Sequence, residues 1–506
     1  MTAVDASGDS ALVAARLATT DTGLRVPHLD GRARPARSDE VGQVVDPGTG
    51  TVLWEVGLAG AADVDDAVAA ARRTFEDGAW RRVPAAERGE ILWRAADAVE
   101  ARAEELALVE SLETGMPVDA ALHGHVLSAV RCFRYHAGLA DKIHGLSGEL
   151  RTADGPYHTY TAREPVGVVG LVVPWNGPIV LSAWKLAAAL AAGCSCVLKP
   201  AEQTPSTALA LARILESVGV PPGVVNVVPG RGGDAGRALA AHPGIDKISF
   251  TGSTATGREV VAAAAGNLKR VALELGGKSP VVVFADADLD ETVPRVAAGI
   301  FTNAGQVCSA GSRLIVEQSV HDPLVEALTA YAGRLRIGHG LDPGTQLGPV
   351  ISAARQAAIL EMVAAGVAGG ATVAAGGAAL DRPGFFVQPT VLTGARPGMA
   401  VLDEEVFGPV LVTQSFRDEA EAARLANDTA FGLAASVFTA DVGRAHRVAA
   451  LIRAGRVVVN SHAMTDYSMP GGGFKQSGWG RANGLEGVGS YLETKSVYVR
   501  TGDGTR

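Results

Sequence analysis

The chain has 506 residues, of which 62 are glycine, and carries a net charge of −9 at pH 7. This length exceeds the size at which one hydrophobic core stops growing, so two or more domains are expected. The acidic balance argues against a nucleic-acid partner, and four cysteines are too few for a disulfide scaffold in so long a chain. Their scarcity is typical of a reducing cytoplasm.

Residues 1–24 are small and polar, and we expect them to form a flexible tail. They lack the basic and apolar segments of a signal peptide. The longest apolar run, 178–198, is interrupted by Lys185 and predicts a buried helix followed by a strand. We therefore expect no membrane association and a cytoplasmic location.

A hairpin is predicted over 41–54, turning at Asp46-Pro47-Gly48, and two amphipathic helices follow it. From Pro165 onward apolar strands alternate with helices, which is the pattern of a parallel, doubly wound sheet. Ligands bind such sheets at the carboxyl ends of the strands, here 174–177, 199–202 and 251–254, so a nucleotide site is expected there. The predicted strands are 165–173, 195–198, 224–228 and 247–250, and the predicted helices are 183–192, 207–218 and 236–241.

Two glycine-containing turns are candidates for binding a phosphate. Residues 230–235 match the G-x-G-x-x-[G/A] fingerprint, but the next strand ends in Phe250-Thr251-Gly252 without an acid for a ribose. We interpret this match as an ordinary turn between a strand and a helix. Residues 251–257 are the better candidate, because their N–H groups and the Ser253 hydroxyl open a helix. A serine at a helix start is nevertheless common without any ligand.

After Cys308 the alternation of strands and helices resumes to about residue 475 and predicts a second lobe. Residues 158–163 and 491–499 also alternate like strands but have no obvious partners, and we interpret them as oligomerisation strands. The predicted fold class is α/β, with two doubly wound parallel-sheet (Rossmann-like) lobes and a small β-strand oligomerisation element.

The chemistry is expected between residues 273 and 313. Glu274 lies on a glycine turn, and Cys308 follows in a second glycine-flanked loop. Cysteine is a strong nucleophile near neutral pH and glutamate a competent general base. An isolated Glu–Cys pair is more often structural, but small neighbours leave room here for a ligand. Cys132, Cys194 and Cys196 are interpreted as packing residues, and no metal site is predicted.

Six motifs occur in the order typical of one family, and the chain resembles the aldehyde dehydrogenase superfamily from about residue 41 to 499. Within that superfamily it is most similar to the phenylacetaldehyde-type, broad-specificity branch, in residues 286–290 and 301–313. The motifs are Pro174-Trp175-Asn176, Lys199-Pro200-Ala201-Glu202-Gln203-Thr204-Pro205, Phe250-Thr251-Gly252-Ser253-Thr254, Glu274-Leu275-Gly276-Gly277-Lys278, Gly305-Gln306-Val307-Cys308 and Glu405-Val406-Phe407-Gly408-Pro409.

The resemblance implies a catalytic role for four residues. Cys308 attacks the aldehyde carbon, and the Asn176 amide with the Cys308 N–H holds the oxyanion. After hydride transfer leaves a thioester, Glu274 activates the water that hydrolyses it. Lys185 belongs to a proton relay whose usual acid is replaced by Ala482.

The resemblance also implies NAD as cofactor, with NADP left open. Lys199 and Glu202 hold the adenosine ribose, and Glu202 disfavours a 2′-phosphate. The other residues implied in cofactor binding are Trp175 and Ser253 at the pyrophosphate, Glu405 and Phe407 at the nicotinamide ribose and ring, and Gly252 and Leu275 beside them.

The family resemblance further implies how the chain is divided. It gives an NAD-binding domain (25–146 and 166–276), a catalytic domain (277–475), and oligomerisation strands (147–165 and 486–506). The expected partners are a small aldehyde and further copies of the chain, as a homodimer or homotetramer.

Several positions depart from the family pattern. Gly177, Thr302 and Gly471 stand where relatives often carry aromatic rings, which predicts a wide tunnel and a bulky aldehyde, aromatic or terpenoid. Val307 stands where some relatives have a second cysteine beside the nucleophile.

Three other functions stay open from the sequence. A coenzyme A-acylating enzyme has the same fold, but the hydrolytic base Glu274 argues against it. A cysteine esterase or hydrolase would use Cys308 without a redox step. A non-catalytic binding protein is disfavoured because Cys308, Glu274 and Asn176 are all present.

Overall fold

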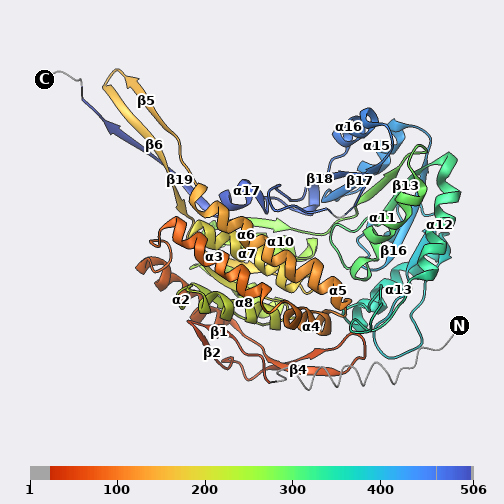
Figure 1. The fold of residues 1–506 in the computed structure, drawn as a ribbon, viewed down its shortest axis with the longest axis horizontal. Helices are drawn as coiled ribbons and strands as arrows, with labels where there is room; N and C mark the ends of the chain where they lie inside the picture. Colours follow the sequence, from red (N-terminus) through yellow and green to blue (C-terminus); the bar gives the residue numbers. More distant parts are fainter. Residues whose placement is uncertain (1–22, 463, 503–506) are drawn as a thin grey trace.

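The computed structural model describes residues 23–462 and 464–502, so the predicted tail lies almost entirely outside the described residues. Two large sheets, each with helices on both faces, form the body of the molecule (Figure 1). A narrow three-stranded sheet projects from the body on one side (Figure 1). This arrangement is the α/β fold that the sequence predicts, with its two lobes and small strand element.

The first sheet has seven strands in the order β11-β10-β7-β8-β9-β1-β2. The strands from β11 to β9 are parallel, while β1 is antiparallel to β9 and to β2. The sheet is therefore mixed at one edge. The bounds are β1 His28–Leu29, β2 Arg32–Ala33, β7 Val168–Val172, β8 Ser195–Lys199, β9 Val225–Val227, β10 Lys247–Thr251 and β11 Arg270–Glu274.

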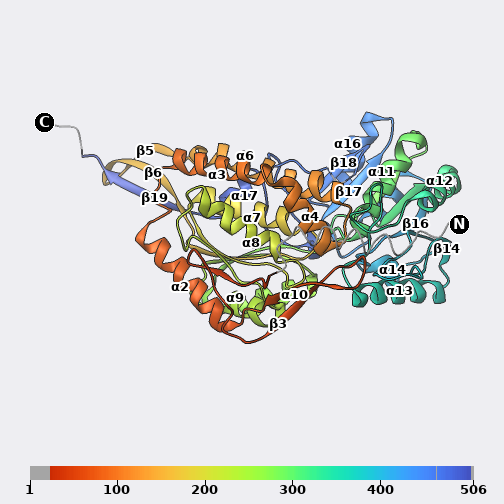
Figure 2. The same cartoon turned by 60° about the horizontal axis from the view of Figure 1, so that its bottom comes forward.

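Helices cover both faces of this sheet because alternate strand residues are apolar on each side. Val169 and Leu171 belong to the core under α3, α6, α7 and α8, whereas Val168 and Val172 belong to the core under α2, α9 and α10 (Figure 2). These helices are α2 Ala61–Asp77, α3 Ala85–Glu100, α6 Leu127–Leu139, α7 Pro178–Ala192, α8 Ser206–Ser217, α9 Arg237–Ala241 and α10 Thr254–Ala264.

The second sheet also has seven strands, in the order β14-β15-β16-β13-β12-β17-β18, all parallel except β14. Its helices are α11 Leu289–Phe301, α12 His321–Arg334 and α13 Ala353–Ala368 on one face, and α15 Glu419–Asn427 and α16 Val442–Leu451 on the other. The strands are β12 Pro280–Val283, β13 Arg313–Glu317, β14 Thr372–Ala375, β15 Thr390–Thr393, β16 Val410–Phe416, β17 Ala434–Phe438 and β18 Arg456–Val459.

Two predicted boundaries in the first lobe are wrong. The strand predicted over 165–173 is interrupted at Gly167, whose φ of +131° packs its α-carbon against Asp246. The helix predicted from residue 183 begins at Pro178, because Gly177 is the N-cap and proline is favoured at the first helical position. The hairpin predicted over 41–54 is present as β3 Val41–Val45 and β4 Val52–Gly57.

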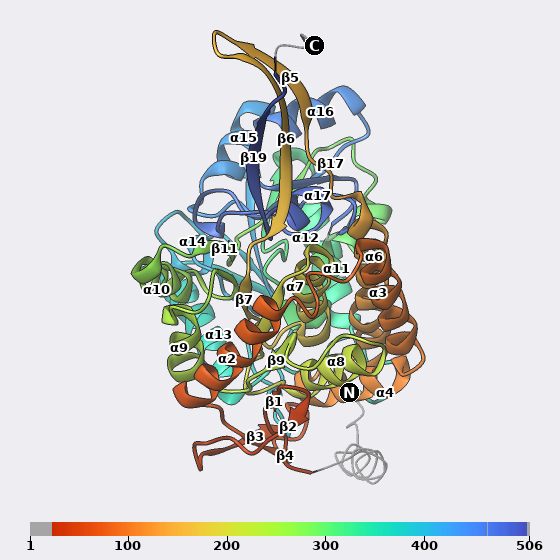
Figure 3. The ribbon, with the colours of Figure 1, turned by 90° about the vertical axis from the view of Figure 1, so that its left-hand side faces the viewer.

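The two segments interpreted as strands without partners pair with each other. In the projecting sheet, β6 Gly155–Pro165 lies between β5 Ser147–Thr152 and β19 Leu492–Arg500, and all pairs are antiparallel (Figure 3). The expectation of strand over 486–506 is wrong at its start, because α17 Gly484–Gly489 is helical. Residues 503–506 lie outside the described residues.

Among the described residues, no helix is long and apolar enough to cross a membrane. The same residues contain no group of three or more His, Cys, Asp or Glu side chains arranged to hold a metal ion.

Candidate active site

The loop that carries Cys308 has an unusual backbone. It follows α11, and three successive residues, Asn303, Ala304 and Gly305, have φ values of 50°, 52° and 71°. A Cβ on Gly305 would lie 2.0 Å from the carbonyl oxygen of Gly408, so only glycine fits there. This turn presents Cys308 half-buried at the start of the next segment.

Asn176 is held against the Cys308 loop from the first lobe. It lies between β7 and α7, and its Nδ2 donates to the carbonyl oxygen of Gln306 at 2.9 Å. Asn303 Nδ2 donates in return to the Asn176 carbonyl oxygen at 3.0 Å. One amide hydrogen of Asn176 stays available for a ligand at Cys308.

Glu274 ends β11 and turns toward the second lobe through two glycines. A Cβ on Gly276 would lie 2.2 Å from Oε2 of Glu405, and one on Gly277 would lie 2.4 Å from the Cys308 carbonyl oxygen. The Gly277 N–H also donates to Glu405 Oε1 at 3.0 Å. The glycines therefore let Glu274, Glu405 and Cys308 approach closely.

Burial has the largest effect on the pKa values of Cys308 and Glu274. It raises the pKa of the Cys308 thiol to about 12, and the charges of Glu405 and Glu274 add to that effect. Burial also raises the pKa of Glu274 above its ordinary value, opposed chiefly by Lys185. The thiol is therefore neutral near pH 7 in the free protein and needs a base to become a nucleophile.

Lys185 lies on α7 and is buried. Its Nζ donates to the Ser249 hydroxyl on β10 at 2.9 Å. Burial lowers the pKa of Lys185, while the charge of Glu274 raises it. Ala482 pairs by backbone hydrogen bonds with Gly471 and brings no carboxylate to Lys185.

The residues expected at the adenosine end of a dinucleotide gather at the carboxyl ends of β8 and β10. Lys199 Nζ donates to the Pro200 carbonyl oxygen at 2.5 Å and lies 3.9 Å from Glu202 Oε2. Ser253 caps α10, accepting the N–H of Thr256 at 3.2 Å. The neighbouring Gly252 has no room for a side chain, because the ring of Phe250 would lie 2.5 Å from its Cβ.

The residues expected at the nicotinamide end also lie together. Phe407, at a φ of 52°, packs edge-on against Trp175 with ring centroids 5.5 Å apart. The guanidinium of Arg355 donates to the Val406 carbonyl oxygen and lies 5.8 Å from the Phe407 ring, while its Nε is buried without a hydrogen-bond partner. An unpaired buried donor beside Glu405 and Phe407 fits a polar ligand such as a nucleotide ribose.

Leu275 directly follows the proposed base, Glu274, and is the last of the residues expected to bind the cofactor. Its N–H donates to the Ser477 carbonyl oxygen at 3.0 Å, and its side chain lies where a Cβ on Gly257 would meet it at 2.7 Å.

The structure brings further residues to the site that no sequence motif indicated. His462 contacts the carbonyl oxygen of Ser309, directly after the nucleophile, through Nε2 at 3.0 Å. Because a carbonyl oxygen can only accept, Nε2 is the donor, and in the neutral ring Nδ1 accepts from the Ser436 hydroxyl at 2.7 Å. Burial lowers the pKa of His462 to about 4, so the ring is neutral near pH 7. Only the fold joins residues so distant in sequence, and the same holds for Arg355 and Ser249.

The profile of the aldehyde dehydrogenase family matches residues 34–497. The chain belongs to this family. It is 45% identical over 467 residues to retinal dehydrogenase 2 of Homo sapiens, covering 92% of this chain and 90% of the relative. Among solved structures, PnpE in complex with nicotinamide adenine dinucleotide has a TM-score of 0.92 at 43% identity, covering 94% and 97% of the two chains. The NAD+ complex of an aldehyde dehydrogenase from Bacillus cereus also has a TM-score of 0.92, at 42% identity and the same coverage.

Aldehyde dehydrogenases are NAD(P)-dependent, and the protein is accordingly an NAD(P)-dependent oxidoreductase. Family membership accounts for the joint presence of the six motifs, since all of them lie within the matched residues.

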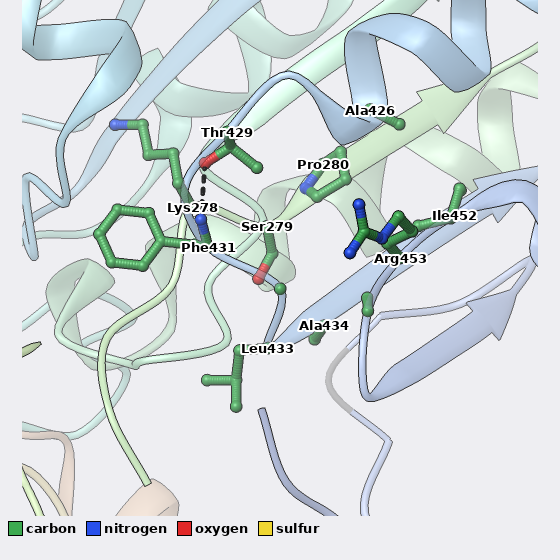
Figure 4. A pocket seen from close by; sticks show the side chains of 12 residues that line it. Lys278, Ser279, Pro280, Ala426, Thr429, Phe431, Leu433, Ala434, Ile452 and Arg453 are labelled. Atoms are coloured by element: carbon green, nitrogen blue, oxygen red, sulfur yellow. Dashed lines mark hydrogen bonds between the residues drawn. The ribbon is translucent and has the colours of Figure 1, made fainter. Parts of the chain in front are cut away.

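A separate small cavity lies behind this site, beside Lys278 (Figure 4). None of the residues that line it is a predicted site residue. Lys278 donates to the Val401 carbonyl oxygen at 2.9 Å, and the Ser279 hydroxyl is buried without a partner. The cavity therefore offers space for a bound water at most, behind the turn that carries Gly277.

Proposed function

We propose that the chain oxidises a bulky aldehyde to a carboxylate with NAD, through a covalent adduct on Cys308. The observation that carries this proposal is the convergence of three groups. Asn176 donates into the Cys308 loop at 2.9 Å, and the turn after Glu274 packs on the Cys308 carbonyl. A nucleophile, an oxyanion donor and a base thus share one site.

In the first step, Cys308 Sγ bonds to the aldehyde carbon and its proton passes to the Glu274 carboxylate. The carbonyl electrons move to oxygen, and the Asn176 amide with the Cys308 N–H donates to that oxyanion. The raised pKa of Cys308 makes proton removal the demanding part of this step. A base with a raised pKa is suited to it, since it holds the proton near neutral pH.

NAD bound by these residues would supply the acceptor for the hydride that leaves the adduct, which would leave a thioester on Cys308. After passing the Cys308 proton to solvent, Glu274 takes a proton from water, whose oxygen bonds to the thioester carbon, and returns that proton to the departing Cys308 sulfur. The carbon–sulfur bond breaks, Cys308 becomes a thiol again and the carboxylic acid leaves. Lys185 favours the Glu274 carboxylate through its charge, which supports this second use of the base.

The assignment of NAD rests on the residues at both ends of the nucleotide site and on relatives solved with NAD bound. Lys199 and Glu202 are assigned to the adenosine ribose, Ser253 and Trp175 to the pyrophosphate, and Gly252 gives the backbone room to approach it. Glu405, Phe407 and Leu275 are assigned to the nicotinamide end. The carboxylate of Glu202 would repel a 2′-phosphate, which favours NAD over NADP.

A bulky substrate is supported by the small residues at three positions. A side chain on Gly471 would meet nothing closer than the Ala482 carbonyl oxygen at 4.0 Å. Thr302 is exposed, and Gly177 opens α7 beside Asn176. Without rings there, a ring-bearing aldehyde such as an aromatic or terpenoid one has room.

The test is a comparison of kcat/KM for acetaldehyde and ring-bearing aldehydes, followed by NADH formation with NAD and with NADP. We expect the ring-bearing aldehydes to be preferred, and NAD over NADP. A preference for acetaldehyde would refute the bulky substrate while leaving the oxidation intact. Ester cleavage without aldehyde-dependent NADH would favour a cysteine esterase, and acyl-coenzyme A formation would favour an acylating enzyme.

We also propose that the chain assembles as a homodimer or homotetramer through 147–165 and the strand near its end. Every residue of β5 is exposed, so its outer edge is available for pairing. The lobes 25–146 with 166–276 and 277–475 then act as NAD-binding and catalytic domains. A cytoplasmic location stays our expectation.

A further inference from the structure

A cation lies beside the nucleophile and the base without a counter-ion. Arg456 is the first residue of β18 and pairs in register with Ala434 on β17. Its positive charge acts on both Cys308 and Glu274, and their charges act on it in turn. A Cβ on Gly277 would lie 2.4 Å from the Cys308 carbonyl oxygen and 3.3 Å from the Cβ of Leu433, which precedes Ala434, so Arg456 begins a strand beside the nucleophile loop.

Among the described residues, only one of the three guanidinium nitrogens of Arg456 forms a hydrogen bond. Nη1 donates to the Thr465 hydroxyl at 2.7 Å. Nε is buried and has no hydrogen-bond partner, and Nη2 has none within 23–462 and 464–502. The Nε–Nη2 edge is the fork that binds a carboxylate with two parallel hydrogen bonds.

Arg456 is also without an ion pair. Neither Glu274 nor any other carboxylate of the described residues lies within ion-pair distance of its guanidinium. A half-buried cation without an ion-pair partner lowers the stability of the folded chain. Burial accordingly lowers the pKa of Arg456. An anion bound at the open fork would offset that cost.

We propose that Arg456 binds a carboxylate of the substrate, so that the preferred aldehyde carries an acid group apart from the carbon that is oxidised. This inference rests on the proposed aldehyde oxidation and narrows its substrate class. Thr465 holds Nη1 and leaves the Nε–Nη2 edge open, so the fork can hold the carboxylate and orient the aldehyde. The acid group is not consumed in the reaction.

Matched pairs of aldehydes test the proposal. One pair is 4-formylbenzoate and its methyl ester, and a second is an aliphatic aldehyde acid and its methyl ester. With the native protein, kcat/KM is expected to favour at least one acid over its ester by about tenfold or more, the size of a charged hydrogen-bonded contact. Equal values for acid and ester in both pairs would overturn the proposal.

The variant Arg456→Met is expected to reduce that acid-to-ester ratio about tenfold or more, mainly through KM. Arg456→Lys keeps the charge but loses the fork and should give an intermediate ratio. The matched control is Arg453→Met, since Arg453 is exposed three residues earlier and should leave the ratio as it is. An unchanged ratio in Arg456→Met would overturn the proposal.

A second measurement separates the remaining explanations. If Arg456 serves a second copy of the chain, Arg456→Met would change the oligomeric mass and leave the acid-to-ester ratio intact, which also overturns the proposal. If Arg456→Met does not fold, Thr465→Val releases Nη1 alone and should still lower the ratio. Absence of NADH with every aldehyde would instead refute the proposed function.

Discussion

Lys185 donates a hydrogen bond of 2.9 Å to Ser249 rather than to a carboxylate. Burial lowers the pKa of Lys185, and the charge of Glu274 raises it. Lys185 and Glu274 therefore bias each other's protonation directly. The Ser249 hydroxyl fixes the direction in which the ammonium points.

Replacing Lys185 by methionine is expected to shift the pH profile of steady-state kcat. The Lys185 charge lowers the pKa of Glu274, so its loss raises that pKa further and less carboxylate is present at a given pH. The ascending limb of the profile should move to higher pH, with a fall of about three- to tenfold at pH 7. Lys142→Met, at an exposed position, is the control. A shift to lower pH would contradict the pairing of Lys185 with Glu274.

Glu274→Gln is expected to separate acylation from hydrolysis. The amide cannot take a proton from water, so steady turnover should fall by about 10²- to 10⁴-fold. A single, slower burst of NADH per active site should remain, measured by rapid mixing. Glu76→Gln, at an exposed site, should behave like the native protein. Full steady turnover in Glu274→Gln would refute its assignment as the base.

His462→Phe is expected to disturb the nucleophile loop. The ring occupies the space beside Gly299 and Gly311 and donates to the carbonyl oxygen of Ser309. Its loss should slow the NADH burst by about tenfold or more, since small misplacements of a nucleophile are costly. His462→Gln, which keeps an N–H donor, should restore part of the burst rate. Equal burst rates in the native protein and in both variants would show that the contact is not needed.

Gly177→Phe is expected to narrow the substrate specificity. The extended backbone there accepts any residue, and a Cβ would lie 3.1 Å from Val180, which must move by a few tenths of an ångström. The ring should reduce kcat/KM for ring-bearing aldehydes about tenfold or more, with a smaller effect on acetaldehyde. Gly177→Ala serves as the control for backbone effects. Equal losses for both aldehydes would argue that Gly177 does not line the tunnel.

Glu202→Gln is expected to relax the cofactor preference. Without the carboxylate, the buried Lys199 ammonium 3.9 Å away is left to attract a 2′-phosphate. The ratio of kcat/KM for NADP to that for NAD should rise about tenfold or more. The neighbouring exposed Gln203→Ala is the control. An unchanged ratio would remove Glu202 from the ribose site.

Strong local patterns in the sequence predict the strands of the first sheet well. Runs such as 195–198 and 247–250 are apolar and bounded by turns, and they form β8 and β10. The partner of a strand is not encoded in its own alternation, so the sequence predicts β6 and β19 as strands but does not predict that they pair. A positive φ at Gly167, which splits one predicted strand, depends on contact with Asp246 and leaves no sequence pattern.

The candidate site likewise contains residues that local motifs predict and residues that only the fold brings together. Glu274, Asn176 and Cys308 lie in short motifs, so their convergence could be expected from the sequence. His462 lies 153 residues from the Ser309 carbonyl that it contacts, and no local motif marks it. Arg456 begins an ordinary strand, and the buried Nε without a hydrogen-bond partner becomes evident only in the folded chain.

The antiparallel pairing of β19 with β6 has a consequence for protein synthesis. Because β19 begins 327 residues after β6 ends (492 − 165 = 327), β6 has one unpaired edge until β19 has been synthesised. A chain truncated before Leu492 would keep that edge open, with its hydrogen-bonding groups available to other nascent chains. The narrow sheet is therefore complete only once β19 has paired with β6.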